Sequence, residues 1–300
     1  MGIPPPGGRL PGRIRLGPAR LQVADLERSL AFYQDVLGLR ILSTGGGRAA
    51  DGEASTDLGA EGSDDALVIL RERPGANPVP RRGRLGLYHF AILLPTRGDL
   101  GRFAAHLVGL DFPFGAADHR VSEALYLRDP DGLGVEVYAD RPRSEWRRQG
   151  QELIMSTDPL DVVGLMKDAG EEAWSGMPPG TGMGHLHLQV GDLDRAEDFY
   201  HRALGLDKMV WSYPGALFLA AGGYHHHLGV NTWGMGALAA GDDDARLLEW
   251  ELQVPGAGDV SRTAESLEGA GFSPEVGSGW ALVRDPWGTS LRIRVQDPSA

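Results

Sequence analysis

The hydrophobic positions of this chain alternate with polar ones in short runs, and each run leads through a polar residue into a helical pattern. In ARLQVADLERSLAFYQDVLGLRIL, residues 19–42, Leu21 and Val23 alternate as in a half-buried strand. Asp25 follows in the position of a helix N-cap, and apolar residues then recur at helical spacing up to Gly38, a residue type that favours helix termination. The pattern predicts a strand, a capped helix and a return to extended chain.

This order of elements occurs four times along the chain. LHLQVGDLDRAEDFYHRALGLDKMV, from residue 186, repeats the first unit with Asp192 in the capping position. Weaker copies begin at YHFAILLP and at LEWELQVP, and each ends with an Asp-Pro-x-Gly turn into a final strand. We expect four strand–helix–strands units near residues 14–72, 85–140, 182–232 and 246–296.

The remaining stretches lack this pattern. Residues 1–13 carry prolines where a signal peptide needs an apolar run, and we expect a disordered N-terminal arm there. Residues 43–63 are Gly-rich and polar, which predicts a flexible loop, and residues 141–181 are expected to be a linker with a short helix around 160–168. The predicted organisation is an arm at 1–13, two units within 14–140, the linker, and two units within 182–296.

Composition narrows the class of protein. The 300 residues are 42% hydrophobic and 23% charged, as in soluble globular chains, and 29 basic against 41 acidic side chains give a formal charge of −12. This charge disfavours binding to nucleic acid or anionic lipid, and no apolar run reaches the roughly 18 residues of a membrane span. The chain has no cysteine, which excludes disulfides, thiolate ligands and a cysteine nucleophile and fits a cytoplasmic location.

Three segments carry a family resemblance. DLERSLAFYQDVLGL, YLRDPDGLGVEVY and GHLHLQVGDLDRAEDFY resemble the vicinal oxygen chelate superfamily of glyoxalases, bleomycin-resistance proteins and extradiol dioxygenases. The resemblance implies an α+β fold, in which four βαβββ modules pair into two cupped mixed sheets with helices outside. The four-module length, HFAILLP and GGYHHHLGVNTW are most similar to the bacterial catechol 2,3-dioxygenase group.

The resemblance also implies where metal ligands lie, because this superfamily uses one residue in the first strand and one in the last strand of paired modules. The corresponding positions here are Pro18, His89, His185 and Glu249 in first strands, and Glu136, Arg292 and a residue near His227 in last strands.

Chemistry discards most pairings of modules. Proline offers no ligand atom and arginine would repel a cation, so modules one and four leave no plausible site. Pairing one with two leaves only a histidine and a glutamate, and pairing three with four leaves His185 with Glu249. Pairing two with three gathers His89, Glu136 and His185, the two-histidine, one-carboxylate set that leaves open positions on Fe(II). His227 stays open as a fourth ligand, and His187 as a residue that supports the ligands.

The same resemblance implies four catalytic residues around the metal. The His225-His226 pair matches the paired histidines of extradiol dioxygenases, and His119 and Tyr126 match their loop histidine and strand tyrosine. A histidine of the 225–227 run would act as general base, and the other two would hydrogen-bond substrate oxygens. Ordinary structural explanations also exist: a core histidine at His89, a polar turn at 225–227, a loop histidine and a core tyrosine.

Three functions therefore compete. The favoured one is an Fe(II)-dependent extradiol dioxygenase that acts on a small aromatic diol with dioxygen. A glyoxalase-like lyase or isomerase would instead use Zn, Ni or Mn and four protein ligands, with His227 deciding between the two. A resistance-type protein would bind a small molecule without turnover. A homodimer stays open, although four modules in one chain already supply the paired interface.

Overall fold

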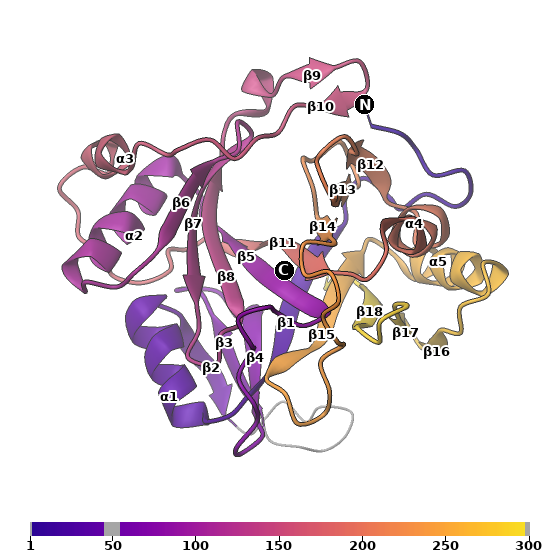
Figure 1. Ribbon diagram of the computed structural model, residues 1–300, viewed down its shortest axis with the longest axis horizontal. Helices are drawn as coiled ribbons and strands as arrows, with labels where there is room; N and C mark the ends of the chain where they lie inside the picture. Colours follow the sequence, from indigo (N-terminus) through magenta and orange to yellow (C-terminus); the bar gives the residue numbers. More distant parts are fainter. Residues whose placement is uncertain (1, 45–54, 298–300) are drawn as a thin grey trace.

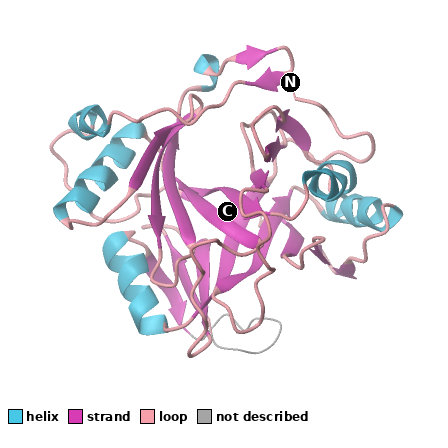
Figure 2. Ribbon diagram, viewed as in Figure 1, coloured by secondary structure: helices cyan, strands magenta, loops and turns pink. Residues whose placement is uncertain are grey.

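The structure, a computed structural model, describes residues 2–44 and 55–297 and contains two large curled sheets with helices on their outer flanks (Figure 1, Figure 2). The strands are β1 Arg15–Val23, β2 Arg40–Thr44, β3 Thr56–Gly59, β4 Ala66–Glu72, β5 Gly86–Leu93, β6 Gly115–Asp118, β7 Ser122–Arg128, β8 Gly134–Asp140, β9 Arg148–Gln149, β10 Glu152–Leu153, β11 Gly182–Gln189, β12 Asp207–Val210, β13 Ala216–Ala220, β14 Leu228–Asn231, β15 Arg246–Val254, β16 Glu275–Gly277, β17 Trp280–Arg284 and β18 Ser290–Val295. The helices are α1 Leu26–Ala31, which continues as a π-helix over Phe32–Val36, α2 Arg97–Gly109, a 3-10 turn at Arg143–Glu145, α3 Val162–Asp168, α4 Leu193–Ala196, which continues as a π-helix over Glu197–Ala203, and α5 Ala257–Gly269.

The four predicted modules are present. Module two pairs with module three, the pairing that was expected to bring His89, Glu136 and His185 together. One eight-stranded sheet has the order β12-β13-β14-β11-β5-β8-β7-β6, and the other has the order β16-β17-β18-β15-β1-β4-β3-β2. Modules two and three therefore join through the antiparallel pair β5 and β11, and modules one and four through β1 and β15. Each half of the chain contributes one module to each sheet.

Local sequence explains where the helices begin. The side chains of Asp25 and Asp192 accept hydrogen bonds from backbone N–H groups three residues later, which confirms both as N-caps. Gly38 adopts φ +79°, a left-handed conformation that ends the first helical segment at little cost for glycine. Thr96 caps α2 in the same way as the two aspartates.

Consecutive modules are tied together by a repeated tyrosine. Tyr33, at the end of the first module's helix, donates to Asp129 in the Asp-Pro-x-Gly turn of the second module at 3.3 Å. Tyr200 donates to Asp285 at the equivalent place in modules three and four, at 2.7 Å. All four side chains are buried, so each bond satisfies polar groups inside the apolar layer between helices and sheets.

Two expectations about irregular segments are corrected. The N-terminal arm is ordered from residue 2: Ile3 pairs with Lys208, Arg9 forms a 2.5 Å ion pair with the buried Asp207, and Leu10 is buried. Prolines had favoured disorder, but an apolar anchor and an ion pair hold the arm against module three. The predicted loop 43–63 contains the end of β2 and all of β3, and its part from 45 to 54 lies outside the described residues.

The segment predicted to be a linker contains one short α-helix. Helix α3 begins after Asp161, which caps it, and ends at Asp168. The short β9–β10 pair precedes it.

Candidate metal centre and cavity

The central strands of the first sheet bring three predicted ligands together. His89 lies on β5, Glu136 on the parallel neighbour β8, and His185 on the antiparallel neighbour β11. Ala91 on β5 pairs with Glu136 on one side and with His185 on the other. His89 lies two residues before Ala91 and so on the same face of the sheet, which brings the side chains of His89, Glu136 and His185 together.

The geometry of this trio fits a cation. His89 Nε2 and His185 Nε2 lie 2.9 and 3.2 Å from the same carboxylate oxygen, Glu136 Oε2. One candidate ligand atom from each residue falls within 4.8 Å of the others, and all three residues are at most 6% exposed. Although His89 Nε2 is buried and close to the carboxylate, this contact lacks hydrogen-bond geometry, which is costly unless a further group binds there.

Electrostatics agrees with the geometry. Burial alone would raise the pKa of Glu136, but His185 and His89 lower it well below its usual range, so the carboxylate is charged. Burial lowers the pKa of His185 to about 4, so this imidazole is neutral and has a lone pair. Two imidazole nitrogens and one carboxylate form a donor set suited to Fe(II).

The position of a fourth protein ligand is occupied by a glycine. His187 pairs with Gly229 in the same way that Ala91 pairs with Glu136, so Gly229 is the last-strand equivalent of the glutamate in module three. The prediction that His227 could be this ligand is wrong by two residues. His227 lies before β14, lines a different cavity, and its Nδ1 accepts from the Ala221 N–H at 3.2 Å.

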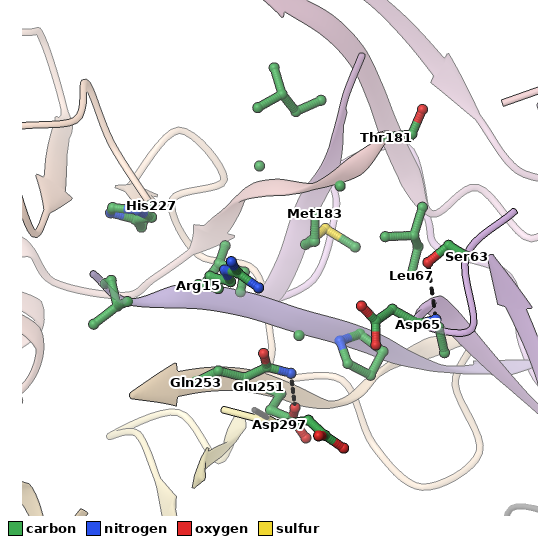
Figure 3. Close-up of a pocket in the computed structure, with 18 of the residues that line it drawn as sticks. Arg15, Ser63, Asp65, Leu67, Thr181, Met183, His227, Glu251, Gln253 and Asp297 are labelled. Carbon is green, nitrogen blue, oxygen red and sulfur yellow. Dashed lines mark hydrogen bonds between the residues drawn. The ribbon is translucent and has the colours of Figure 1, made fainter. Parts of the chain in front are cut away.

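In the described part of the other sheet, the positions equivalent to the ligands are held by residues that bind each other and leave no metal site. Arg292 donates to both carboxylate oxygens of Glu249 at 2.8 and 2.9 Å, so an internal ion pair replaces the ligands. The cavity of about 840 Å³ on this side is lined by mixed charges, and Figure 3 shows Gln253 bonded to Glu251 at its floor. None of the three ligand residues lines this cavity.

His119 and Tyr126 lie beside the trio, as predicted. His119 Nδ1 donates to the Ser156 carbonyl at 2.6 Å, because a carbonyl can only accept. In the neutral ring Nε2 then accepts from the Tyr126 hydroxyl, at 2.5 Å. Burial, together with the charge of Glu136, raises the pKa of Tyr126 well above its usual value, so the phenol keeps its proton.

The histidine run separates into three environments. His226 is buried, lines the cavity in front of the trio, and stacks against His185 with ring centroids 4.1 Å apart. His225 is fully buried behind it, with Nδ1 2.7 Å from His226 Nδ1 and Nε2 2.8 Å from Asp140 Oδ1. His227 points to the other cavity.

This chain of contacts assigns the protons. A carboxylate only accepts, so His225 carries its proton on Nε2, and its Nδ1 accepts from His226 Nδ1. The second nitrogen of His226, Nε2, is left as a free acceptor. Burial lowers the pKa of His226 well below its usual value, which keeps that ring neutral. Asp140 was not among the predicted residues, because its partner lies 85 positions away in sequence.

His187, kept as a supporting residue, packs on His89 with centroids 5.0 Å apart, and its Nε2 is bonded to the Asn231 amide at 3.0 Å. The bond to Asn231 occupies His187 Nε2, so His187 lies beside the ligand His89 without offering this nitrogen to a metal.

The trio forms the end of a cavity of about 480 Å³. Four more lining residues are His119, Tyr126, His187 and His226, and the others are small, apolar or aromatic: Tyr88, Gly115, Ala116, Ala117, Met155, Ser156, Thr157, Tyr213, Phe218 and Trp233. The arrangement can therefore hold an aromatic ring against buried imidazoles.

Comparisons with known proteins agree with the fold. The profile of the family described as "Glyoxalase/Bleomycin resistance protein/Dioxygenase superfamily" matches residues 15–137 and 182–299. The chain is 42% identical over 275 residues to "Catechol-2,3-dioxygenase" of Bacillus subtilis (strain 168), an alignment that covers 90% of this chain and 93% of the relative. It is 30% identical over 128 residues to "Biphenyl-2,3-diol 1,2-dioxygenase 3" of Rhodococcus globerulus, which covers 42% of this chain and 63% of the relative.

Solved structures show the same fold at low identity. A Bacillus subtilis protein superposes with a TM-score of 0.66 at 15% identity, over 97% of this chain and 87% of that one. Glyoxalase I from Zea mays superposes with a TM-score of 0.57 at 17% identity, over 94% and 92% of the two chains. Separately, none of the helices in the described part of the chain has the length and apolarity needed to cross a lipid bilayer.

Proposed function

We propose that this chain, which belongs to the Glyoxalase/Bleomycin resistance protein/Dioxygenase superfamily, is an Fe(II)-dependent extradiol dioxygenase that opens the ring of a catechol-like diol. Membership and fold were predicted from the sequence and are confirmed, and the chain is an enzyme of the dioxygenase class. The metal, the substrate and the residue roles below are our proposals.

The observation that carries this proposal is the ligand trio with a glycine at the fourth position. His89, Glu136 and His185 would hold the metal, and Gly229 contributes no side chain to it. Bound there, Fe(II) would supply open coordination positions for the diol and dioxygen and a path for electrons from the diol to dioxygen.

His226 would act as the general base. Its unprotonated Nε2 is available to the cavity, and a buried neutral imidazole can take a proton from a diol hydroxyl. His225 would hold that ring in the required tautomer, and Asp140 would hold His225. Both are positioning residues, because neither lines the cavity.

His119 and Tyr126 would orient the diol. The histidine fixes the direction of the phenol hydroxyl, and both side chains line the cavity beside Glu136. Because its proton is donated to His119, the Tyr126 oxygen would accept a hydrogen bond from a diol hydroxyl, while His119, with both ring nitrogens already bonded, would hold the phenol in that orientation.

A glyoxalase-like lyase or isomerase is less well supported. That reading required four protein ligands with His227 among them, and His227 lines the other cavity. A binding protein without turnover would not require the ordered chain from Asp140 to His226 behind the cavity.

The test is purification without oxygen, metal analysis, and addition of catechol in air. We expect bound iron and formation of the yellow ring-opened product. The dioxygenase proposal would be refuted if the purified protein contained zinc or nickel and no iron, or if it formed no product after loading with Fe(II).

A further inference from the structure

We propose that the cavity selects diols whose ring carries an uncharged, apolar substituent and rejects diols that carry a carboxylate. This inference rests on the proposed function and adds the substrate class. Two features impose it: the aromatic rim, defined here as Tyr88, Tyr213, Phe218 and Trp233, and the absence of arginine and lysine among the described residues that line this cavity.

The first argument is charge. Among the described residues that line the cavity there is no arginine or lysine. A carboxylate on the substrate would lose its water shell and gain no ionic partner, which is strongly unfavourable. Arg81, Arg82 and Arg128 line a neighbouring cavity that shares Tyr88 and Trp233, but none of the three lines this one. The Arg128 guanidinium donates to the Gly132 carbonyl at 2.8 Å.

The second argument is the shape of the rim. Trp233 lies 5.6 Å from Tyr88 and 6.3 Å from Tyr213, and Tyr213 lies 5.6 Å from Phe218, measured between ring centroids. The four rings come from both modules and form one continuous apolar surface. Such a surface favours an alkyl or aryl group through burial and ring contacts.

The third argument is position. The ligand trio is at most 6% exposed, whereas Tyr88 is 37% and Trp233 46% exposed, so the rim lies toward the solvent end of the cavity. A diol whose oxygens face the ligands therefore directs its substituent toward the rim. The volume of about 480 Å³ is within the range of about 300–1,000 Å³ typical of sites for ligands larger than a single ring.

Trp233 is also held in place before any ligand binds. Its indole N–H donates to the Pro214 carbonyl at 2.9 Å, and its backbone N–H donates to Asn231 Oδ1 at 3.0 Å. An anchored ring loses little freedom when a substituent packs on it. Thr157 borders the same region, with its hydroxyl 2.8 Å from the Tyr213 hydroxyl.

The experiment compares kcat/KM of the iron-loaded protein for catechol, 3-phenylcatechol, 4-methylcatechol and 3,4-dihydroxybenzoate. We expect the uncharged diols to exceed the carboxylated one by on the order of 100-fold. A carboxylated diol that is cleaved as fast as catechol would overturn the inference. If no diol is cleaved, the proposed function fails, and the same ranking measured as binding to the oxygen-free protein still decides the inference.

Variants distinguish a substrate-specific effect of the aromatic rim from a general loss of activity. Trp233→Ala should lower kcat/KM for 3-phenylcatechol about 10-fold more than for catechol, because only the former reaches the rim. Leu238→Ala, on the same loop and 71% exposed, is the matched control and should change neither value. An equal loss for both diols in Trp233→Ala would contradict the assignment.

Thr157→Arg tests the charge argument in the opposite direction. A guanidinium at the rim should narrow the discrimination against 3,4-dihydroxybenzoate by about 10-fold, since it supplies the missing ionic partner. Unchanged discrimination in a variant with normal circular dichroism would show that charge at the rim does not set specificity.

Discussion

The residue whose role depends most on the structure is Asp140. Its carboxylate accepts from His225 Nε2, and that bond leaves His226 with an unprotonated nitrogen toward the cavity. Asn at this position keeps the size of the side chain but can present an N–H to His225. The two histidines would then exchange protons, with His225 donating through Nδ1 and His226 carrying its proton on Nε2, where it cannot act as a base.

The size of the effect follows from the bond that is lost. A hydrogen bond to a charged group contributes about 1.5–3 kcal/mol, and each 1.4 kcal/mol corresponds to a tenfold change. Asp140 is 28% exposed, which places the expected loss toward the lower half of this range. Asp140→Asn should therefore reduce kcat for catechol by about 10- to 50-fold.

The assay is the rate of ring-opened product after iron-loaded, oxygen-free protein is mixed with catechol in air. Iron content should be unchanged, because Asp140 does not contact the ligand trio. Asp118→Asn is the matched control, since Asp118 accepts from Arg141 at 2.7 Å without contacting His225. If Asp140→Asn retains the wild-type kcat, or if Asp118→Asn loses as much, the assigned proton positions are wrong.

Three further predictions concern stability. Burial raises the pKa of Asp129 to about 7. The contribution of this carboxyl group to the free energy of unfolding should be greatest below its unfolded-state pKa, which is near 4, and should decrease by up to about 1.4 kcal/mol per pH unit as pH rises toward 7. Asp129→Asn should remove this part of the pH dependence in urea unfolding, and an unchanged pH dependence would contradict the assignment. Leu10→Ala should lower the free energy of unfolding by about 2 kcal/mol if the arm is docked, and no change in the urea midpoint would show that it is not. Arg292→Ala leaves the Glu249 carboxylate unpaired and should cost about 1–3 kcal/mol with iron content unchanged, whereas loss of iron would place a ligand in the wrong sheet.

The module repeat made the fold predictable. Alternating strands, capped helices and Asp-Pro-x-Gly turns are local signals, and the two sheets contain all four units near their predicted bounds. The pairing of modules was predictable because the ligand types allow only one complete set, His89, Glu136 and His185, and these residues do lie together.

Other features depend on contacts that the sequence does not reveal. The turn before β14 contains Gly222 and Gly223, both with positive φ, and placing the last-strand position near His227 set the strand register two residues too early. His227 was therefore considered a ligand, while the equivalent position is Gly229. Asp140 was missed for a similar reason, because its bond to His225 joins β8 to a turn in another module.

The arm shows the opposite error. Its prolines and glycines predict disorder, but a single buried leucine and an ion pair to Asp207 are enough to hold it. Composition describes the average tendency of a segment, and two specific anchors can override it.

The most direct test of the metal site is the iron content of oxygen-free Glu136→Gln, measured beside wild type and Glu251→Gln. Both variants neutralise a buried carboxylate, but only Glu136 lies 2.9 and 3.2 Å from the two histidine nitrogens. The account predicts that Glu136→Gln loses most of its iron and Glu251→Gln keeps it. Full iron content in a folded Glu136→Gln would show that the metal is bound elsewhere.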